Sequence, residues 1–156
     1  MRIERDFEVP AAPPEAYALL IDLERIAACI PGSEVGSRDD DGAHPAKITI
    51  RLGPMRMTYT GKVRIEDHDD DAHRAVLATN MREQSGQGAA KATMTMTVAE
   101  SGTGSQVATV TDVELTGRAA QMGRGVVDDV AARMVADMAT CIAARLAPAD
   151  NDGGEG

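Results

Sequence analysis

Two groups of polar residues in this sequence have side chains that could do chemistry. The first is the run at residues 67–73, where His68 and His73 stand among four aspartates and supply atoms of the kinds that bind metal ions. Their spacing matches no closed set of ligands, whereas an aspartate cluster between two apolar stretches is typical of a turn. We therefore predict a polar hairpin turn and no metal site. His44 is interpreted as a turn residue in the same way.

The second group consists of two polar residues within an apolar alternation. Tyr59 could donate a hydrogen bond from its phenol to a carbonyl oxygen of a bound molecule. Glu83 is in register with Met81 and could stand at the mouth of a binding space. Either residue could equally be a structural or an exposed group. The sequence has no nucleophile elbow, phosphate loop or Cys-x-x-Cys motif, so no catalytic residue is predicted.

One long segment organises the elements around these residues. Residues 116–146 are predicted to form a single helix of roughly 40 Å, at about 1.5 Å per residue. Its apolar residues recur every three or four positions, and they are Ala119, Met122, Gly123, Val126, Val127, Val130, Met134, Met138 and Ile142. A helix of this length needs a wide surface beneath it.

The rest of the chain is predicted to provide that surface as strands. Residues 2–9 alternate apolar and charged side chains, and residues 33–115 have a period of two with turn clusters between runs, which together predict seven antiparallel strands. The face of the last strand, residues 106–115, can be interpreted either way. Residues 15–30 predict one helix, or two short helices broken near Asp22.

We therefore predict an α+β fold in which a curved seven-stranded antiparallel sheet wraps around the long helix, with two short helices after the first strand. Residues 1–147 would form one domain, and residues 148–156 a disordered acidic, glycine-rich tail. Small residues on the inner helix face would widen the space between the layers, and they are Ala119, Ala120, Gly123 and Val127.

That space is predicted to be an apolar cavity. From the strands its lining would be Ile48, Ile50, Met57, Tyr59, Met81, Met94 and Met96, and from the helix Met122, Gly123, Val126, Val127 and Val130. The alternative is a filled core made of the same residues, because a stripe of methionines is most often packing.

Composition limits the partners and the location. A formal net charge of -9 opposes binding to nucleic acid or to anionic lipid, although a local basic patch could still act within a Debye length. Cys29 and Cys141 lie in apolar contexts far apart in the chain and are predicted to be buried free thiols in a reducing compartment, with a disulfide as the alternative. Neither a targeting signal nor a membrane-spanning stretch is evident, so a cytoplasmic location is expected.

Arg118 and Arg124, predicted at the start of the long helix, could contact lipid headgroups or an acidic partner, or could be solvated.

Three segments carry a family resemblance: residues 14–34, which contain AACIPGSE, the GPM turn at 53–55, and VELTGRAAQMGRG at 113–125. The order of elements resembles the START-like superfamily, whose helix-grip fold is shared by lipid-transfer proteins and polyketide cyclases. Within it, these segments resemble the G-subunit family of aerobic carbon monoxide dehydrogenases.

The resemblance implies a non-enzymatic accessory protein of a molybdenum hydroxylase. Such a protein would hold a lipophilic quinone such as menaquinone in its cavity, without a metal, and would link a carbon monoxide dehydrogenase complex to the inner face of the cell membrane. Two alternatives stay open, namely a polyketide cyclase or aromatase, and an adaptor or membrane-recruitment protein with a filled core and no ligand.

Overall fold

The structure is a computed structural model that describes residues 1–52 and 54–146. Gly53 of the predicted GPM turn and the predicted tail at 148–156 lie outside the described residues.

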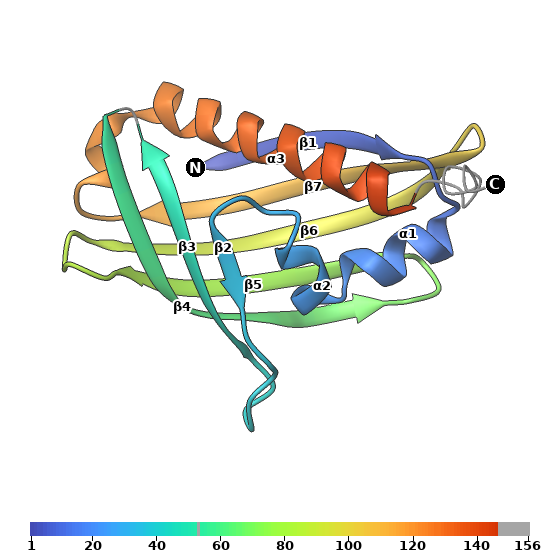
Figure 1. Cartoon of the computed structure of the whole chain (residues 1–156), viewed down its shortest axis with the longest axis horizontal. Coiled ribbons are helices and arrows are strands. Elements are labelled where there is room, and N and C mark those ends of the chain that lie inside the picture. The colour runs from blue at the N-terminus through green and yellow to red at the C-terminus, as the bar shows by residue number, and fades with distance from the viewer. Residues whose placement is uncertain (53, 147–156) are drawn as a thin grey trace.

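A single antiparallel sheet forms most of the molecule and confirms the predicted strands. The strands are β1 (Arg2–Val9), β2 (Ser33–Val35), β3 (His44–Leu52), β4 (Met55–Asp69), β5 (Arg74–Glu83), β6 (Ala89–Ser101) and β7 (Gly104–Leu115). Their order across the sheet is β1-β7-β6-β5-β4-β3-β2. The long helix α3 lies over the concave side of this sheet (Figure 1). The α+β prediction with seven curved strands around a helix is therefore confirmed.

The backbone of β4 comes unusually close to that of β5 at one position. Gly61 in β4 pairs with Met81, and a Cβ atom built on Gly61 would lie 2.0 Å from the carbonyl oxygen of Asn80. Only glycine permits this approach. A register shift between Ile65 and Asp67 adds a second irregularity in the same strand, and such bulges increase strand bending. β4 therefore contains two features that favour bending of the strand.

Two short helices follow β1, as predicted. They are α1 (Pro13–Leu20) and α2 (Leu23–Ala27). The break falls at Asp22, whose carboxylate accepts a hydrogen bond from the Arg25 backbone N–H at 3.3 Å and so begins α2.

The long helix is shorter than predicted. A 3₁₀ helix, η1 (Ala119–Met122), precedes α3, which begins at Arg124 and ends at Leu146. Gly123 separates the two with φ of +86°, a left-handed conformation that interrupts helical hydrogen bonding. The prediction of one helix from residue 116 is therefore wrong, and the 23 residues of α3 span about 35 Å.

The buried apolar residues form two groups, one toward each end of the grip. The first core group is Phe7, Val9, Ala16, Tyr17, Leu19, Leu20, Leu23, Ile26, Cys29, Ala75, Met96, Val98, Val107 and Ile142. The second core group has four buried residues, Met57, Tyr59, Ala119 and Val130. Nine partly buried residues surround it, namely Ile48, Ile50, Met55, Met81, Ala90, Leu115, Met122, Val126 and Met134. The second group is therefore the more loosely enclosed of the two.

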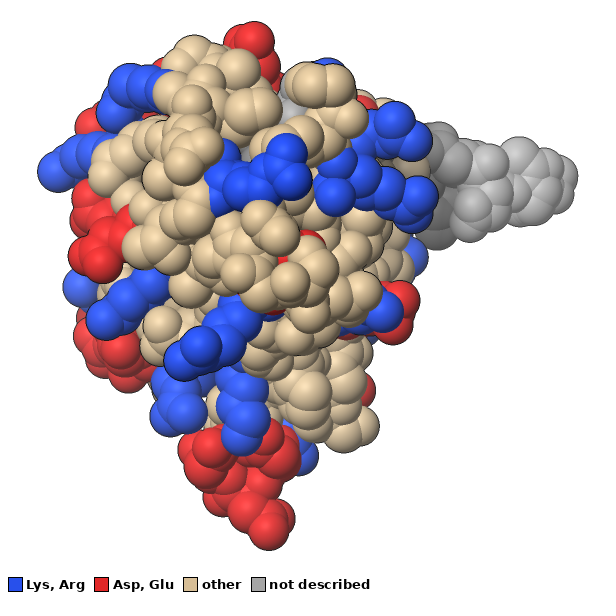
Figure 2. Space-filling view, turned by 90° about the vertical axis from the view of Figure 1, so that its left-hand side faces the viewer, with Lys and Arg blue, Asp and Glu red and all other residues tan. Residues whose placement is uncertain are grey.

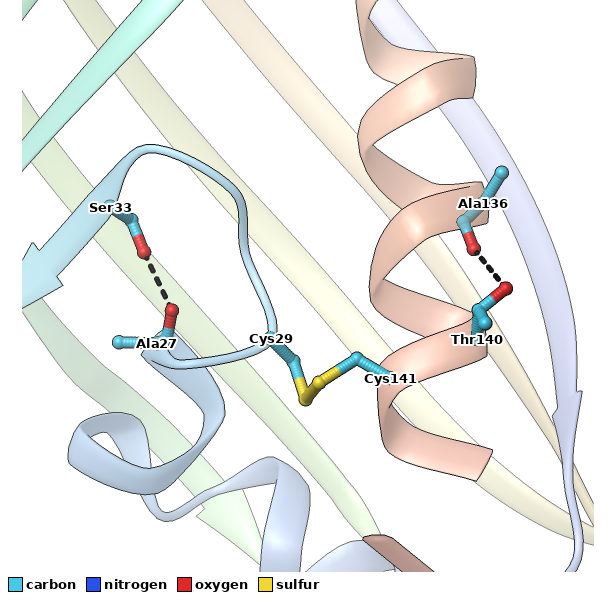
Figure 3. Close-up of a disulfide and its surroundings, with 6 residues drawn as sticks. All are labelled: Ala27, Cys29, Ser33, Ala136, Thr140 and Cys141. Carbon is cyan, nitrogen blue, oxygen red and sulfur yellow. Dashed lines mark hydrogen bonds between the residues drawn. A yellow bond between two sulfur atoms is a disulfide. The ribbon is translucent and has the colours of Figure 1, made fainter. Parts of the chain in front are cut away.

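A disulfide closes the first core group, so the prediction of free thiols is wrong. Cys29 and Cys141 are bonded, with their Cα atoms 5.3 Å apart although 112 residues separate them in sequence (Figure 3). The fold brings the last turns of α3 beside the connection between α2 and β2, a proximity that sequence spacing does not reveal. Because the two cysteines are bonded, they do not indicate a reducing compartment.

The face of β7, left open by the sequence, is settled by its pairing with β1. Ser105, Val107 and Thr109 are buried, and they lie opposite Val9, Phe7 and Arg5 respectively. These residues and the apolar positions of β1 therefore share the concave face.

Candidate functional site

Tyr59 is a buried phenol with a poor hydrogen-bond partner. Its side chain is 2% exposed within the second core group, and its hydroxyl donates to the Met57 Sδ at 3.9 Å. Burial raises the pKa of the Tyr59 phenol, and the negative charge of Glu83 raises it further. A thioether is a weak acceptor, so this O–H could form a much stronger bond with a carbonyl oxygen.

The second core group gathers most of the residues predicted to line a cavity. It contains Ile48, Ile50, Met57, Tyr59, Met81, Met122, Val126 and Val130. Met96 lies in the first core group instead. Met94 is partly buried and Val127 is buried, and neither belongs to a core group.

The small residues before α3 do not all face inward. Ala119 is buried at 1% exposure, but Ala120 and Gly123 are exposed. The prediction that Ala120 and Gly123 lie on the inner helix face is wrong, because both precede the helix and Gly123 redirects the chain.

A shallow depression of about 260 Å³ opens beside the second core group. Its lining is Met55, Arg56, Met57, Glu83, Ser85, Gln87 and Arg118. The volume lies just below the roughly 300 Å³ at which small-molecule pockets begin, so the depression could admit one end of a long ligand. The remainder would have to displace side chains of the second core group, which its methionines can accommodate because they are flexible.

Glu83 holds the rim of this depression in shape. The residue is 7% exposed, and its carboxylate accepts hydrogen bonds from the backbone N–H groups of Ser85 (2.9 Å), Gln87 (3.1 Å) and Thr58 (3.4 Å), and from the Ser85 hydroxyl. These bonds, led by that of the Ser85 hydroxyl, hold the pKa of Glu83 below its usual value. Glu83 therefore lines the depression, with its carboxylate bound to the turn between β5 and β6.

This arrangement predicts a pH-dependent stability difference for Glu83→Gln. Because the folded-state pKa is lowered, the ionised carboxylate stabilises the fold above its unfolded-state pKa, and that stability is lost as pH falls through the folded-state pKa. The melting temperature of the variant should therefore lie below that of the wild type at pH 7, by a gap that narrows as pH falls toward 3. Glu34→Gln, at an exposed position in β2, is the control for loss of a carboxylate. A gap that stayed constant with pH would contradict the role assigned to Glu83.

Four arginines lie in or beside the segments that form the depression, and two of them, Arg56 and Arg118, line it. Arg51 and Arg56 lie directly opposite each other in the β3–β4 pair, where like charges repel. Within the described parts of the chain, no carboxylate oxygen lies within 4 Å of the guanidinium groups of these two residues, of Arg82 or of Arg118. We call Arg51, Arg56, Arg82 and Arg118 the basic rim. Figure 2, which faces this end, shows Lys and Arg side chains around a centre without charged side chains, and acidic side chains gathered at a projecting tip.

The two arginines predicted to contact a membrane or partner have different surroundings. Arg118 lines the depression, and its backbone N–H donates to the Gln87 carbonyl at 2.9 Å. Arg124 forms an ion pair with Asp128 at 3.5 Å and donates to the carbonyl of Arg2. Arg118 is thus the one available to an external anion.

Sequence reasoning missed Arg5. It occupies the inward position of β1 between the buried residues Ile3 and Phe7. Its Nη2 donates to the Asp128 carbonyl at 3.4 Å, and its buried Nε has no acceptor among the described residues. The signal was present in the sequence, because a charge at the inward position of an alternating strand is unusual.

The histidine and aspartate run forms the predicted hairpin turn. β4 ends at Asp69 and β5 begins at Arg74. Asp70 accepts a hydrogen bond from the Tyr17 hydroxyl (3.0 Å) and pairs with His68 Nδ1 (2.9 Å), which connects α1 to this turn. Burial, followed by the bond to Asp70, raises the pKa of Tyr17 to about 12. Residues 1–52 and 54–146 contain no group of three or more side chains placed to hold a metal ion.

The helices provide no membrane span. None of those in the described part of the chain is both long enough and apolar enough to cross a bilayer.

Comparison with models of known protein families identifies the family of this chain. The sequence model of the carbon monoxide dehydrogenase G-subunit (CoxG) matches residues 6–147. The chain belongs to the CoxG family. No curated protein matches this CoxG-family chain.

Solved structures confirm the START-like fold of this CoxG-family chain. A conserved protein from Geobacillus kaustophilus has a TM-score of 0.83 at 17% identity, covering 96% of this chain and 97% of that one. A START superfamily protein from Mycobacterium smegmatis has a TM-score of 0.62 at 14% identity, covering 93% and 96%. The Zhui aromatase/cyclase from Streptomyces sp. R1128 has a TM-score of 0.65 at 11% identity, covering 94% and 93%. Family and fold together suggest a ligand-binding accessory protein, and the cyclase neighbour leaves an enzymatic activity open.

Proposed function

We propose that this protein binds a lipophilic quinone, menaquinone or a relative, as a non-enzymatic accessory protein that links a molybdenum hydroxylase of the carbon monoxide dehydrogenase type to the membrane respiratory chain. The observation that carries the proposal is the buried Tyr59 hydroxyl, whose hydrogen-bond partner among the described residues is a thioether amid apolar side chains. A quinone supplies a carbonyl acceptor for that hydroxyl and an isoprenoid tail for the apolar surroundings. Each methylene-sized group removed from water contributes about 0.8 kcal/mol.

The second core group has properties suited to such a tail. Five methionines belong to it, and four of them, Met55, Met81, Met122 and Met134, are only partly buried. Unbranched thioether side chains can move aside at low cost and still contact a ligand. The disulfide ties the C-terminal half of α3 to the α2–β2 connection, whereas the N-terminal half, which covers this group, carries no such link. Ligand entry would therefore involve the N-terminal half of α3.

The basic rim supports a peripheral contact with an anionic membrane, on the cytoplasmic side. In a chain with a net charge of -9, the four arginines of the basic rim, two of which line the depression, would turn this end toward anionic lipid. The acidic residues of the β4–β5 turn lie beyond the far ends of the same strands and would be repelled. A quinone leaving the bilayer would then meet the depression first.

Organic extraction followed by mass spectrometry tests the proposal. Protein isolated from a host that makes menaquinone should yield a prenylated quinone in the extract. Tyr59→Phe, which removes only the hydroxyl, should retain less quinone, by about tenfold for the loss of one hydrogen bond in a buried site. Thr60→Ala, an exposed neighbour in β4, is the matched control. Wild-type protein that carries no prenylated quinone and binds none when supplied with menaquinone-4 would refute the proposal.

A second candidate function is cyclisation of a poly-ketone, favoured by the similarity in fold to the Zhui aromatase/cyclase. Such chemistry needs an acid or base placed at the substrate. Glu83 is held by the β5–β6 turn, and Tyr59 is a phenol with a raised pKa, so neither is a ready base at neutral pH. Conversion of a supplied poly-ketone by the wild type, lost in Tyr59→Phe, would favour this function over quinone carriage.

A further inference from the structure

Arg5 places a guanidinium group on the concave side of the sheet. In the register of β1 with β7 it lies opposite Thr109, and Thr109 in turn lies opposite Met96 of β6. Both of these neighbours are buried. Arg5 therefore shares its face with the interior of the grip, between the sheet and α3.

The Arg5 guanidinium makes few hydrogen bonds to the described part of the protein. Its one hydrogen bond runs from Nη2 to the Asp128 carbonyl at 3.4 Å, a long and weak contact. Nε is shielded from solvent and has no acceptor, and no carboxylate oxygen lies within 4 Å of the group in the described residues. Thr109, the nearest cross-strand hydroxyl, donates to the Arg5 carbonyl at 2.8 Å instead.

The poorly paired Arg5 guanidinium does not stabilise the folded state. Arginine stays charged at every physiological pH, so Arg5 is a half-buried cation without a counter-ion among the residues that the structure describes. A buried donor without an acceptor is destabilising, and replacing a buried charge by an apolar residue of similar volume is often neutral or stabilising. Packing alone therefore gives no reason for an arginine between Ile3 and Phe7.

The surroundings identify what the group could bind. Arg5 meets α3 at Asp128, two residues before Val130, which packs in the second core group with Tyr59. A ligand lying beneath this part of α3 would meet Tyr59 from the β4 side and Arg5 from the β1 side. An N–H donor that is positively charged selects an oxygen acceptor, and most strongly an oxygen with negative charge.

We propose that Arg5 is a ligand-binding residue that donates its free N–H to an oxygen, carbonyl or carboxylate, on the lipophilic molecule held in the grip. The inference rests on the proposed function in requiring a ligand between the sheet and α3. Arg5 would be a second polar contact for the ligand, on the opposite side of the helix from Tyr59. The ligand would then be an apolar molecule that bears an oxygen acceptor.

Binding of two probes to Arg5 variants tests this inference. Menaquinone-4 presents neutral carbonyl oxygens and palmitate presents a carboxylate, so the pair distinguishes the two sources of the acceptor. Arg5→Met should weaken binding of the probe that the wild type prefers by about tenfold or more, as expected for a hydrogen bond to a charged group. Arg5→Lys, which keeps the charge, should recover part of that loss. Arg2→Met, an exposed arginine of the same strand, should bind as the wild type does.

Melting temperatures without ligand separate binding from structure. Arg5→Met should melt at or above the wild-type temperature, because it removes an uncompensated buried charge. A variant that melts lower and binds both probes normally would overturn the inference and assign Arg5 a structural role. If Arg5→Met fails to fold, Arg5→Leu, which likewise removes the charge and the N–H donors, provides the same comparison. Wild-type protein that binds neither probe would overturn the proposed function together with this inference, whereas equal binding by wild type and Arg5→Met would overturn the inference alone.

Discussion

Removal of the Cys29–Cys141 disulfide should lower the free energy of unfolding by about 2–4 kcal/mol, the usual range for a native cross-link. The closed loop spans most of the described chain, so the cross-link excludes a large part of the unfolded ensemble. For a domain of this size, a loss of that magnitude corresponds to a fall in melting temperature of roughly 5–15 °C. Thermal unfolding of the wild type with and without reductant measures the effect.

The double variant Cys29→Ala/Cys141→Ala is the control for this measurement. It should melt at about the temperature of the reduced wild type and should not respond to reductant. Because Cys29 is 2% exposed, reduction of the folded protein should be slow unless the end of α3 opens. An identical melting temperature for the oxidised and reduced wild type would contradict the stabilising role of the cross-link.

Charge reversal in the basic rim should abolish binding to anionic vesicles. Arg51→Glu/Arg56→Glu replaces two cations of the basic rim by anions, one of them, Arg56, in the lining of the depression. Each basic residue near an anionic surface contributes about 1 kcal/mol, so two reversals should weaken binding by roughly a hundredfold or more at low salt. Sedimentation with vesicles of about 30% phosphatidylserine, in about 50 mM and about 300 mM salt, measures the loss and its dependence on screening.

The matched control places the same change of charge elsewhere. Arg133→Glu/Arg145→Glu alters two exposed arginines of α3 and should leave vesicle binding within about threefold of the wild type. Equal losses in both double variants would mean that net charge, rather than the basic rim, governs the contact. Wild-type protein that stays in solution with these vesicles at low salt would refute the proposed membrane contact while leaving quinone binding intact.

Much of the fold was predictable because its signals are local. The two-residue alternation in β3, β4 and β6 reports which side chains face inward, since successive side chains of a strand point to opposite faces. The break at Asp22 and the hairpin turn at 67–73 likewise depend on residues within a few positions of each other. The segments at 14–34, 53–55 and 113–125 indicated the family, which the match over residues 6–147 confirms.

The sequence by itself determined the concave apolar face, the order of the strands along the chain and the position of Tyr59 on that face, because each follows from local periodicity. Only the tertiary structure decided the Cys29–Cys141 bond, the donors that surround Glu83 and the poor pairing of Arg5. The disulfide and the Arg5 contact depend on segments more than a hundred residues apart, and the Glu83 contacts depend on how a turn meets the neighbouring strand. Periodicity predicts the direction of a side chain from its strand, whereas its partners are determined by how the sheet curves around α3.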